Sequence, residues 1–275
     1  MSAHTVNQFN GHTRHTDPHL VGVCADHPAS TWDWQVLPTP RVQLVARGSM
    51  RIVTEDRIHV VPAGQAVWIP AGLRYQVATA DALRLWTVDF TDSEDPHPIT
   101  VFRAPPLMRE MARTSCAWRN SPPDDAPVGA FSAAFAGMLP IWRRDVLPTD
   151  IPTAQSKQLR RALAHMLGRL GRPVGLADAA LAGAVSERTL QRRCRTELQM
   201  SLSSWLTRAR VIHSLELLSS THSDRSVAAI ARSCGYNSPA AFTRAFSQLL
   251  STTPSAWRSA AALPDVPPEV MVAHA

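Results

Sequence analysis

The most constraining feature of this sequence is a short segment that occurs twice, with variation, in its C-terminal half. SERTLQRRCR runs from Ser186 to Arg195, and SPAAFTRAFS runs from Ser238 to Ser247. Each copy begins with a serine, which is favoured as a helix N-cap because its side chain accepts a hydrogen bond from a free backbone amide. The copies then share an apolar residue, an arginine and a second non-polar residue at the same spacing: Leu190, Arg192 and Cys194 in the first, Phe242, Arg244 and Phe246 in the second. Each copy therefore predicts a capped helix with a buried face and a basic face.

A short apolar helix is predicted before each copy, over Leu176–Ala182 and over Val227–Ser233. The capped helices themselves are predicted over Glu187–Leu198 and Pro239–Leu250. A helix, a tight turn and a second, basic helix are typical of a helix-turn-helix motif. A longer apolar helix over Leu202–Leu218 is predicted to join the two motifs. Three further residues mark the ends of these helices: Ser201 and Ser226 as N-caps, and Gly235 at a left-handed turn position.

The distribution of charge agrees with this pattern. Residues 1–150 hold 13 arginines and lysines and 15 acidic residues, whereas residues 151–262 hold 15 arginines and lysines and only 5 acidic residues. The positive charge is thus concentrated in the part that carries the two motifs. Such a surface attracts the phosphate backbone of a nucleic acid.

The N-terminal half predicts a different fold. Short alternating or β-branched segments fill residues 32–90, and Pro-Gly turns separate them, as in a β-sandwich or a small barrel. Helices are predicted over Pro105–Trp118 and Val128–Val146, with Pro140 as a kink. Leu147–Pro152 is predicted to be a linker, and Gln155–Leu170 an amphipathic helix. The predicted fold class is therefore α+β.

Residues 173–258 resemble the DNA-binding domain of the AraC/XylS family of bacterial transcription regulators. The segments that carry the resemblance are SERTLQRRC (186–194), LTRARVIHSLELL (206–218), VAAIARSCGYNSPAAFTRAF (227–246) and TTPSAWR (252–258). The resemblance implies that the second helix of each motif enters a major groove and that the long helix spaces the two about one DNA turn apart. It also implies that the chain is a sequence-specific transcription regulator.

The same resemblance implies which side chains contact DNA. Arg188, Gln191 and Arg192 would face bases, because arginine pairs well with guanine and glutamine with adenine. Arg195 would lie near the DNA backbone. The second motif would present Ala240, Thr243 and Arg244, and Thr189 and Ser238 complete the predicted set. Since the second motif has fewer polar side chains, the first is expected to dominate base discrimination.

Three positions depart from the family pattern. Ala184, Gln199 and Ser251 stand where the family usually has glycine. Each of these positions follows the end of a predicted helix, where a left-handed backbone favours glycine. The departures put the local turn geometry in question, and leave the predicted fold unchanged.

The segment RIHVVPAGQAVWIPAGLRYQV (57–77) resembles the cupin-type sensor half of such regulators. Tyr75 stands where family members often have histidine, and His59 is the only histidine between residues 28 and 96. A metal-dependent cupin enzyme needs a cluster of histidines around one site. We therefore predict a barrel with no catalytic residues, no metal and no cofactor.

The aromatic residues of this half allow two interpretations. Arg41, Trp68, Tyr75 and Trp86 are candidates to bind an apolar or aromatic small molecule. Alternatively, the aromatic rings only fill the barrel. The helices between residues 105 and 146 are open to a similar choice, because they either join two subunits or pack against the barrel.

With the resemblance, the predicted organisation is a flexible leader over residues 1–30, a cupin-like barrel over 31–100, a helical extension and linker over 101–150, an AraC-type DNA-binding domain over 151–262 and a flexible tail over 263–275. The predicted partners are double-stranded promoter or operator DNA, RNA polymerase, a small-molecule effector and a second copy of the chain. No segment has the apolar length of a membrane span or signal peptide, which predicts a cytoplasmic protein.

Two other functions stay open at this stage. One is an enzyme, either a cupin with or without a metal or a DNA-repair protein with a similar DNA-binding half. Four scattered cysteines do not favour the repair protein, which would need a reactive thiolate and commonly a cysteine-rich zinc site. The other is an architectural or partner-binding role for the same DNA-binding fold.

Overall fold

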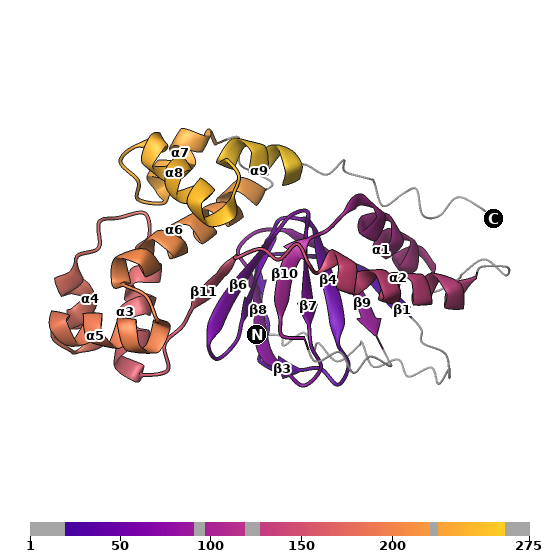
Figure 1. The fold of residues 1–275 in the computed structure, drawn as a ribbon, viewed down its shortest axis with the longest axis horizontal. Coiled ribbons are helices and arrows are strands. Elements are labelled where there is room, and N and C mark those ends of the chain that lie inside the picture. The colour runs from indigo at the N-terminus through magenta and orange to yellow at the C-terminus, as the bar shows by residue number, and fades with distance from the viewer. Residues whose placement is uncertain (1–19, 91–96, 119–126, 221–224, 262–275) are drawn as a thin grey trace.

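A computed structural model describes residues 20–90, 97–118, 127–220 and 225–261 of the chain. An N-terminal part made of antiparallel strands and two helices is followed by a C-terminal part made of helices (Figure 1). The predicted α+β class is confirmed.

Within the described residues, the strands form two antiparallel sheets. Sheet 1 has the order β1 (Leu20–His27), β9 (Leu83–Phe90), β4 (Arg41–Arg47), β7 (Gln65–Ile69) and β10 (Thr100–Arg103). Sheet 2 has the order β11 (Asp150–Pro152), β6 (Arg57–Pro62), β5 (Ser49–Val53), β8 (Arg74–Thr79) and β2 (Ser30–Thr31), and β3 (Gln35–Val36) also pairs with β8. Whether the two sheets close into a barrel stays a prediction.

The side chains of each strand alternate between two environments. In β5, Met50 and Ile52 are fully buried in the core between the sheets, while Arg51 points to the outer face of sheet 2. The turn into β5 depends on Gly48, whose φ is 80°. A Cβ at this position would lie 2.3 Å from the carbonyl oxygen of Ala82, so no larger residue fits there.

Two helices cover the outer face of sheet 1. They are α1 (Pro106–Trp118) and α2 (Val128–Trp142). Trp68 and Phe90 from the sheet meet Phe135 and Trp142 from α2 in one buried cluster. The helices thus pack against the sheets, which was one of the two alternatives. Helix α2 contains Pro140 and ends four residues before the predicted Val146.

The structure corrects two of the predicted irregular segments. Leu20–His27 lies in the predicted leader but forms β1, which pairs with β9 along its whole length. Asp150–Pro152 lies in the predicted linker but forms β11, which pairs with β6. Both are edge strands whose partners are far away in sequence, so local pattern does not reveal them. Residues 1–19 of the leader and the tail 263–275 lie outside the described residues.

The C-terminal helices follow the sequence pattern closely. They are α3 (Lys157–Leu167), α4 (Leu176–Gly183), α5 (Glu187–Leu198), α6 (Leu202–Ser219), α7 (Val227–Ser233), α8 (Pro239–Leu250) and α9 (Pro254–Ala261). Helix α6 contacts α5 of the first motif and α7, α8 and α9 of the second, so it joins the two (Figure 1). Cys194 and Cys234 are free thiols with fully buried side chains, as expected of small core residues.

Candidate nucleic-acid interface

Serine side chains begin four of these helices. The Ser186 hydroxyl accepts a hydrogen bond of 3.2 Å from the Thr189 backbone amide at the start of α5. Ser238 does the same for Ala241 at the start of α8, also at 3.2 Å. Ser201 and Ser226 cap α6 and α7 in the same way. All four predicted caps are confirmed, and both reading helices, α5 and α8, therefore begin at defined residues.

The three departures from glycine keep a left-handed backbone. Ala184, Gln199 and Ser251 have φ values of 53°, 55° and 54°, and they end α4, α5 and α8. A side chain in this conformation costs about 1–2 kcal/mol. The turns are therefore those that glycine would favour, and the chain forms them with strain.

This strain leads to a stability prediction. Ala184→Gly is expected to raise the free energy of unfolding by roughly 0.5–1 kcal/mol, because relief of the left-handed strain exceeds the entropy that glycine adds to the unfolded chain. Gln199→Gly and Ser251→Gly are expected to act in the same direction. Urea unfolding measures the change. Glycine at Ala182, which is inside α4, serves as the control and is expected to destabilise the protein.

Gly235 places the turn of the second motif against the loop that follows α3. Its φ is 77°, and a Cβ there would lie 2.5 Å from the Leu170 carbonyl oxygen and 2.8 Å from a guanidinium nitrogen of Arg210. Arg210 itself donates a 3.1 Å hydrogen bond from Nε to the same carbonyl. The loop after α3 and the turn after α7 are thus in close contact.

Helix α5 separates its buried side chains from its polar ones. Leu190, Cys194 and Leu198 are buried against the domain core. The predicted base-reading residues Arg188, Gln191 and Arg192 are exposed on the other side, as is Arg195. Thr189 is half-buried, and its hydroxyl accepts a 2.9 Å hydrogen bond from Ser186. The structure therefore gathers the predicted residues of the first motif on one exposed face.

Helix α8 presents fewer polar groups. Phe242 and Phe246 are fully buried, and Ala240 and Arg244 are exposed. Thr243 and the cap Ser238 are half-buried. Arg244 is the only charged residue of this helix. The two motifs thus share one backbone design but differ in the chemistry of their exposed faces.

The exposed arginines of these two faces form no ion pair with any residue that the structure describes. Among the described residues, no acidic side chain pairs with Arg188, Arg192, Arg195 or Arg244. Arg193 of the same helix instead donates a 3.2 Å hydrogen bond to Gln158 of α3. An unpaired guanidinium on a helix face keeps its donors available for phosphate or guanine.

A hollow of about 280 Å³ adjoins the first reading helix. Its polar lining includes Gln191 and Arg195 of α5 and Ser203 of the first turn of α6, and Met166 and Leu206 are among its apolar residues. The start of a helix presents unpaired backbone amides that attract anions. Sequence reasoning assigned Ser201 only a capping role and did not include Ser203. Two serines in the first turn of a helix beside a basic one were the available signal.

The structure brings two of the four predicted ligand residues of the N-terminal part together, and the other two lie elsewhere. Arg41 pairs with Asp89 through two contacts, of 2.8 and 3.2 Å, and lies near Tyr75 on the side facing between the sheets. Trp68 is on the opposite side of sheet 1, in the cluster with α2, and Trp86 packs against that cluster. Strand alternation thus places the aromatic rings on different faces of the sheets, and the binding of a ligand by these residues stays a prediction.

The space between the sheets contains polar groups that sequence reasoning missed. Gln43, His59, Gln65 and Tyr75 are each at most 7% exposed. Each carries a side-chain atom with no hydrogen-bond partner among the described residues: Gln43 Oε1, His59 Nε2, Gln65 Oε1 and the Tyr75 hydroxyl. Burial raises the pKa of Tyr75 to about 12 and lowers that of His59, so both are uncharged at neutral pH. The available signal was a glutamine within each of two apolar strands.

Neither a metal site nor a membrane-spanning helix is present in the described residues. No group of three or more histidine, cysteine or acidic residues is arranged to hold a metal ion. In the same residues, no helix has the length and apolar character needed to cross a membrane.

Comparison with known proteins supports the C-terminal interface. Residues 179–260 match a family described as a helix-turn-helix domain. The chain is 29% identical over 126 residues to the HTH-type transcriptional activator RhaR of Klebsiella pneumoniae. These residues are 45% of this chain and 44% of that protein. It is also 29% identical over 107 residues to the regulatory protein PocR of Salmonella typhimurium, or 39% of this chain and 35% of that one.

A solved AraC-type regulator from Chromobacterium violaceum is 25% identical, with a TM-score of 0.37, and the match covers 39% of this chain and 94% of that one. The chain spans less than half the length of the two curated relatives above. The residues that match the helix-turn-helix family, 179–260, run from within α4 to α9. Residues 179–260 thus match a helix-turn-helix domain, and over less than half of its length the chain is similar to proteins that regulate transcription.

Proposed function

We propose that this chain is a sequence-specific transcription regulator that reads double-stranded promoter or operator DNA with α5 and α8. The observation that carries the proposal is the exposed face of α5, where Arg188, Gln191 and Arg192 stand together without ion-pair partners among the described residues. These side chains have the donors and acceptors that distinguish guanine and adenine in the major groove.

We propose that three of the other predicted residues, together with Ser203, hold the protein on the DNA backbone. Arg195 and Ser203 line the hollow at the start of α6, where a phosphate would meet a cation, a hydroxyl and helix amides. Thr189 and Ser238 lie in the first turns of the reading helices or at their caps, where backbone phosphates commonly bind. These contacts would set the register and carry no base preference.

Selection from random-sequence duplex DNA tests the proposal. The full chain is expected to enrich one motif with two parts whose centres lie about one helical turn apart. Gel shifts with the enriched duplex and a scrambled duplex at the same salt concentration then measure specificity. Equal affinity for the two duplexes would contradict the proposal.

The difference between the motifs gives a second prediction. Arg244→Ala is expected to relax base preference only in the part of the site read by α8, and to cost about 1 kcal/mol, the low end of the range for such contacts. The physical reason is that the remaining exposed face of α8 is short of polar side chains. Repeating the selection with the variant measures the effect. Relaxation in both parts would mean that the two helices do not read separate segments.

We further propose that a small neutral molecule binds between the two sheets and modulates DNA binding. The proposal rests on the four buried polar side chains that each carry an atom without a hydrogen-bond partner among the described residues, since an unpaired buried polar atom costs about 1–3 kcal/mol. The charged groups Arg41 and Asp89, which lie near Tyr75, neutralise each other. Mass spectrometry of compounds released from purified wild-type protein tests this. A stoichiometric compound is expected that Gln43→Leu with Tyr75→Phe loses, and its absence from the wild type would contradict the proposal.

Three finer features complete the proposed function: a homodimer, a contact with RNA polymerase and a location in the cytoplasm. The homodimer is supported by Leu107 of α1 and Ile141 of α2, which are 54% and 50% exposed. Large apolar side chains at a surface favour a partner contact. Sedimentation of the wild type and of Leu107→Glu with Ile141→Glu measures the association, which the substitutions are expected to weaken.

A further inference from the structure

One face of α6 contacts the N-terminal part along the whole length of the helix. The residues of this face recur every three or four positions: Trp205, Arg208, Ile212, Glu216 and the C-cap residue Ser220. Such spacing places side chains in one stripe, here roughly 22 Å long at 1.5 Å per residue. The stripe begins at the Pro152 carbonyl, to which the Trp205 indole donates a 2.8 Å hydrogen bond, and ends at Asp81, which accepts one of 2.7 Å from Ser220.

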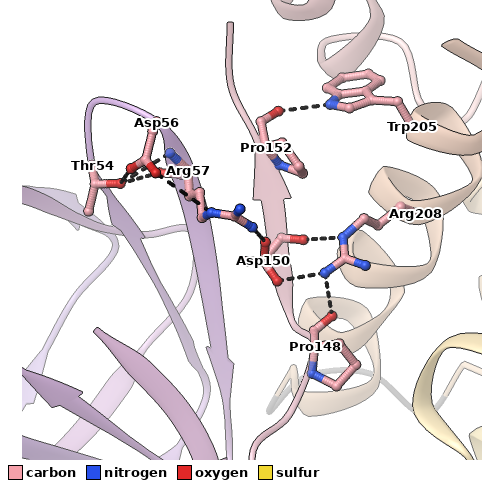
Figure 2. Close-up of polar contacts among 8 residues, drawn as sticks. All are labelled: Thr54, Asp56, Arg57, Pro148, Asp150, Pro152, Trp205 and Arg208. Atoms are coloured by element: carbon pink, nitrogen blue, oxygen red, sulfur yellow. Dashed lines mark hydrogen bonds and ion pairs between the residues drawn. The ribbon is translucent and has the colours of Figure 1, made fainter. Parts of the chain in front are cut away.

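Asp150 of β11 is the centre of the first charged cluster on this stripe (Figure 2). Arg208 of α6 donates to an Asp150 carboxylate oxygen and to the Asp150 carbonyl, both at 2.5 Å, and to the Pro148 carbonyl at 3.2 Å. Arg57 of β6 pairs with the other carboxylate oxygen. Burial raises the pKa of Asp150, but the two guanidinium groups outweigh it and hold that pKa below its ordinary value. The cluster thus joins β6, β11 and α6.

Glu216 of α6 is the centre of the second cluster. Arg51 of β5 donates to both of its carboxylate oxygens, at 2.5 and 2.6 Å, and His213 Nδ1 lies 2.9 Å from one of them. The Glu216 side chain is only 11% exposed. Burial raises its pKa, but His213 and Arg51 keep it below the ordinary value. A buried carboxylate of this kind is stable only while its partners stay in place.

The strands that hold α6 also form one wall of the space between the sheets. Arg51 faces α6, while its neighbours Met50 and Ile52 face the interior. His59 is buried opposite Ile52 in the same sheet, and residue 58 pairs with Ile151 of β11. Sheet 2 therefore separates the interior from α6 by a single layer of backbone.

We propose that the outer face of sheet 2 is a dock for α6, and that docking presents both reading helices to DNA in one fixed arrangement. This inference rests on the proposed function, because it concerns how that function is regulated. A change at the inner face of the wall is transmitted to Arg51 on its outer face and to Asp150 at the sheet edge, and from these two residues to α6. Since both motifs are attached to α6, both readers respond together.

The docked state is the one that binds DNA. With both clusters formed, Arg188, Arg192 and Arg244 remain exposed, so the dock does not cover the reading faces. Docking also restrains the helix that spaces the motifs, which lowers the entropy lost when both enter the groove. Undocking is therefore expected to weaken binding to a complete site more than binding to one half of it.

Charge reversal across the second cluster tests the proposal. The probes are a duplex selected by the wild type and the same duplex with the part read by α8 scrambled. Arg51→Glu is expected to lower affinity for the complete site about 10-fold, within the range of allosteric coupling, and to change affinity for the half site less than 2-fold. The double variant R51E/E216R is expected to recover to within about 3-fold of the wild type. Arg47→Glu, an exposed reversal in the same part of the chain, is the control for net charge.

Small-angle X-ray scattering without DNA gives an independent reading. Arg51→Glu is expected to increase the radius of gyration, and the double variant to restore it. Unchanged affinity and unchanged radius in Arg51→Glu would overturn the dock, as would a double variant no better than the single ones. If the double variant does not melt cooperatively, Arg51→Ala serves instead, with a 5- to 10-fold loss on the complete site expected. A wild type that binds no specific DNA would overturn the proposed function, whereas the radius still reports on the dock.

Discussion

Arg192→Ala is expected to lower affinity for the selected DNA site by about 5- to 150-fold, which corresponds to 1–3 kcal/mol, and to relax base preference at one position. Arg192 stands in the middle of the exposed face of α5, one turn after Arg188, and pairs with no acidic residue among those described. A guanidinium that has no ion pair in the unbound protein loses no such contact when it pairs with guanine. Most of the free energy of its hydrogen bonds to guanine therefore contributes to the affinity for DNA.

Arg193→Ala is the matched control, because it removes the same charge from the next position of the same helix. Arg193 turns toward α3 and donates to Gln158. Its loss is therefore expected to lower the affinity for all DNA sequences slightly and equally. Titrations with the selected duplex and with single-base variants, at one salt concentration, separate the two effects. If Arg192→Ala keeps the wild-type order of preference, Arg192 does not read a base.

Gly235→Ala is expected to lower the free energy of unfolding of the C-terminal part by about 2 kcal/mol or more. The left-handed backbone costs a side chain roughly 1–2 kcal/mol. The new Cβ would also lie 2.5 Å from the Leu170 carbonyl oxygen, which is backbone and cannot rotate away. The loop after α3 would have to move, and its hydrogen bond from Arg210 would be disturbed.

Gly72→Ala is the control that separates the cost of the left-handed backbone from the cost of the close contact. Gly72 has a φ of 74°, close to that of Gly235, but a Cβ there would meet no atom within 4 Å. Its substitution is expected to cost only the backbone term. Urea unfolding of the two variants gives the difference directly. Equal destabilisation would mean that the contact between the loop and the turn contributes nothing.

The helical half could be predicted from sequence because its signals are local. The serine caps at Ser186 and Ser238 and the apolar spacing between them gave the bounds of α5 and α8 to the residue. A helix is formed by contacts three and four residues apart, so its sequence contains most of the information that defines it. The exposed face of α5 followed from the same spacing.

The N-terminal half was less predictable because its pairings are long-range. Neither β1 nor β11 shows clear alternation, and each is held by a strand distant in sequence. The faces on which the ligand candidates lie could not be predicted for a related reason. All five residues of β7 are buried, so apolar character alone does not tell which face Trp68 occupies. Trp68 lies on the face of sheet 1 that α2 covers, and that face is defined only by the packing of the helix on the sheet.

Strand β11 limits where the chain can be divided into stable fragments. A cut before Asp150 would leave β6 as an open sheet edge, and open edges favour aggregation. It would also strip Trp205 and Ile212, at 1% and 0% exposure, of the sheet that covers them. A fragment that begins after the sheets would therefore expose an apolar face of α6 that is buried in the whole protein. Such a fragment is expected to aggregate more readily than the whole protein.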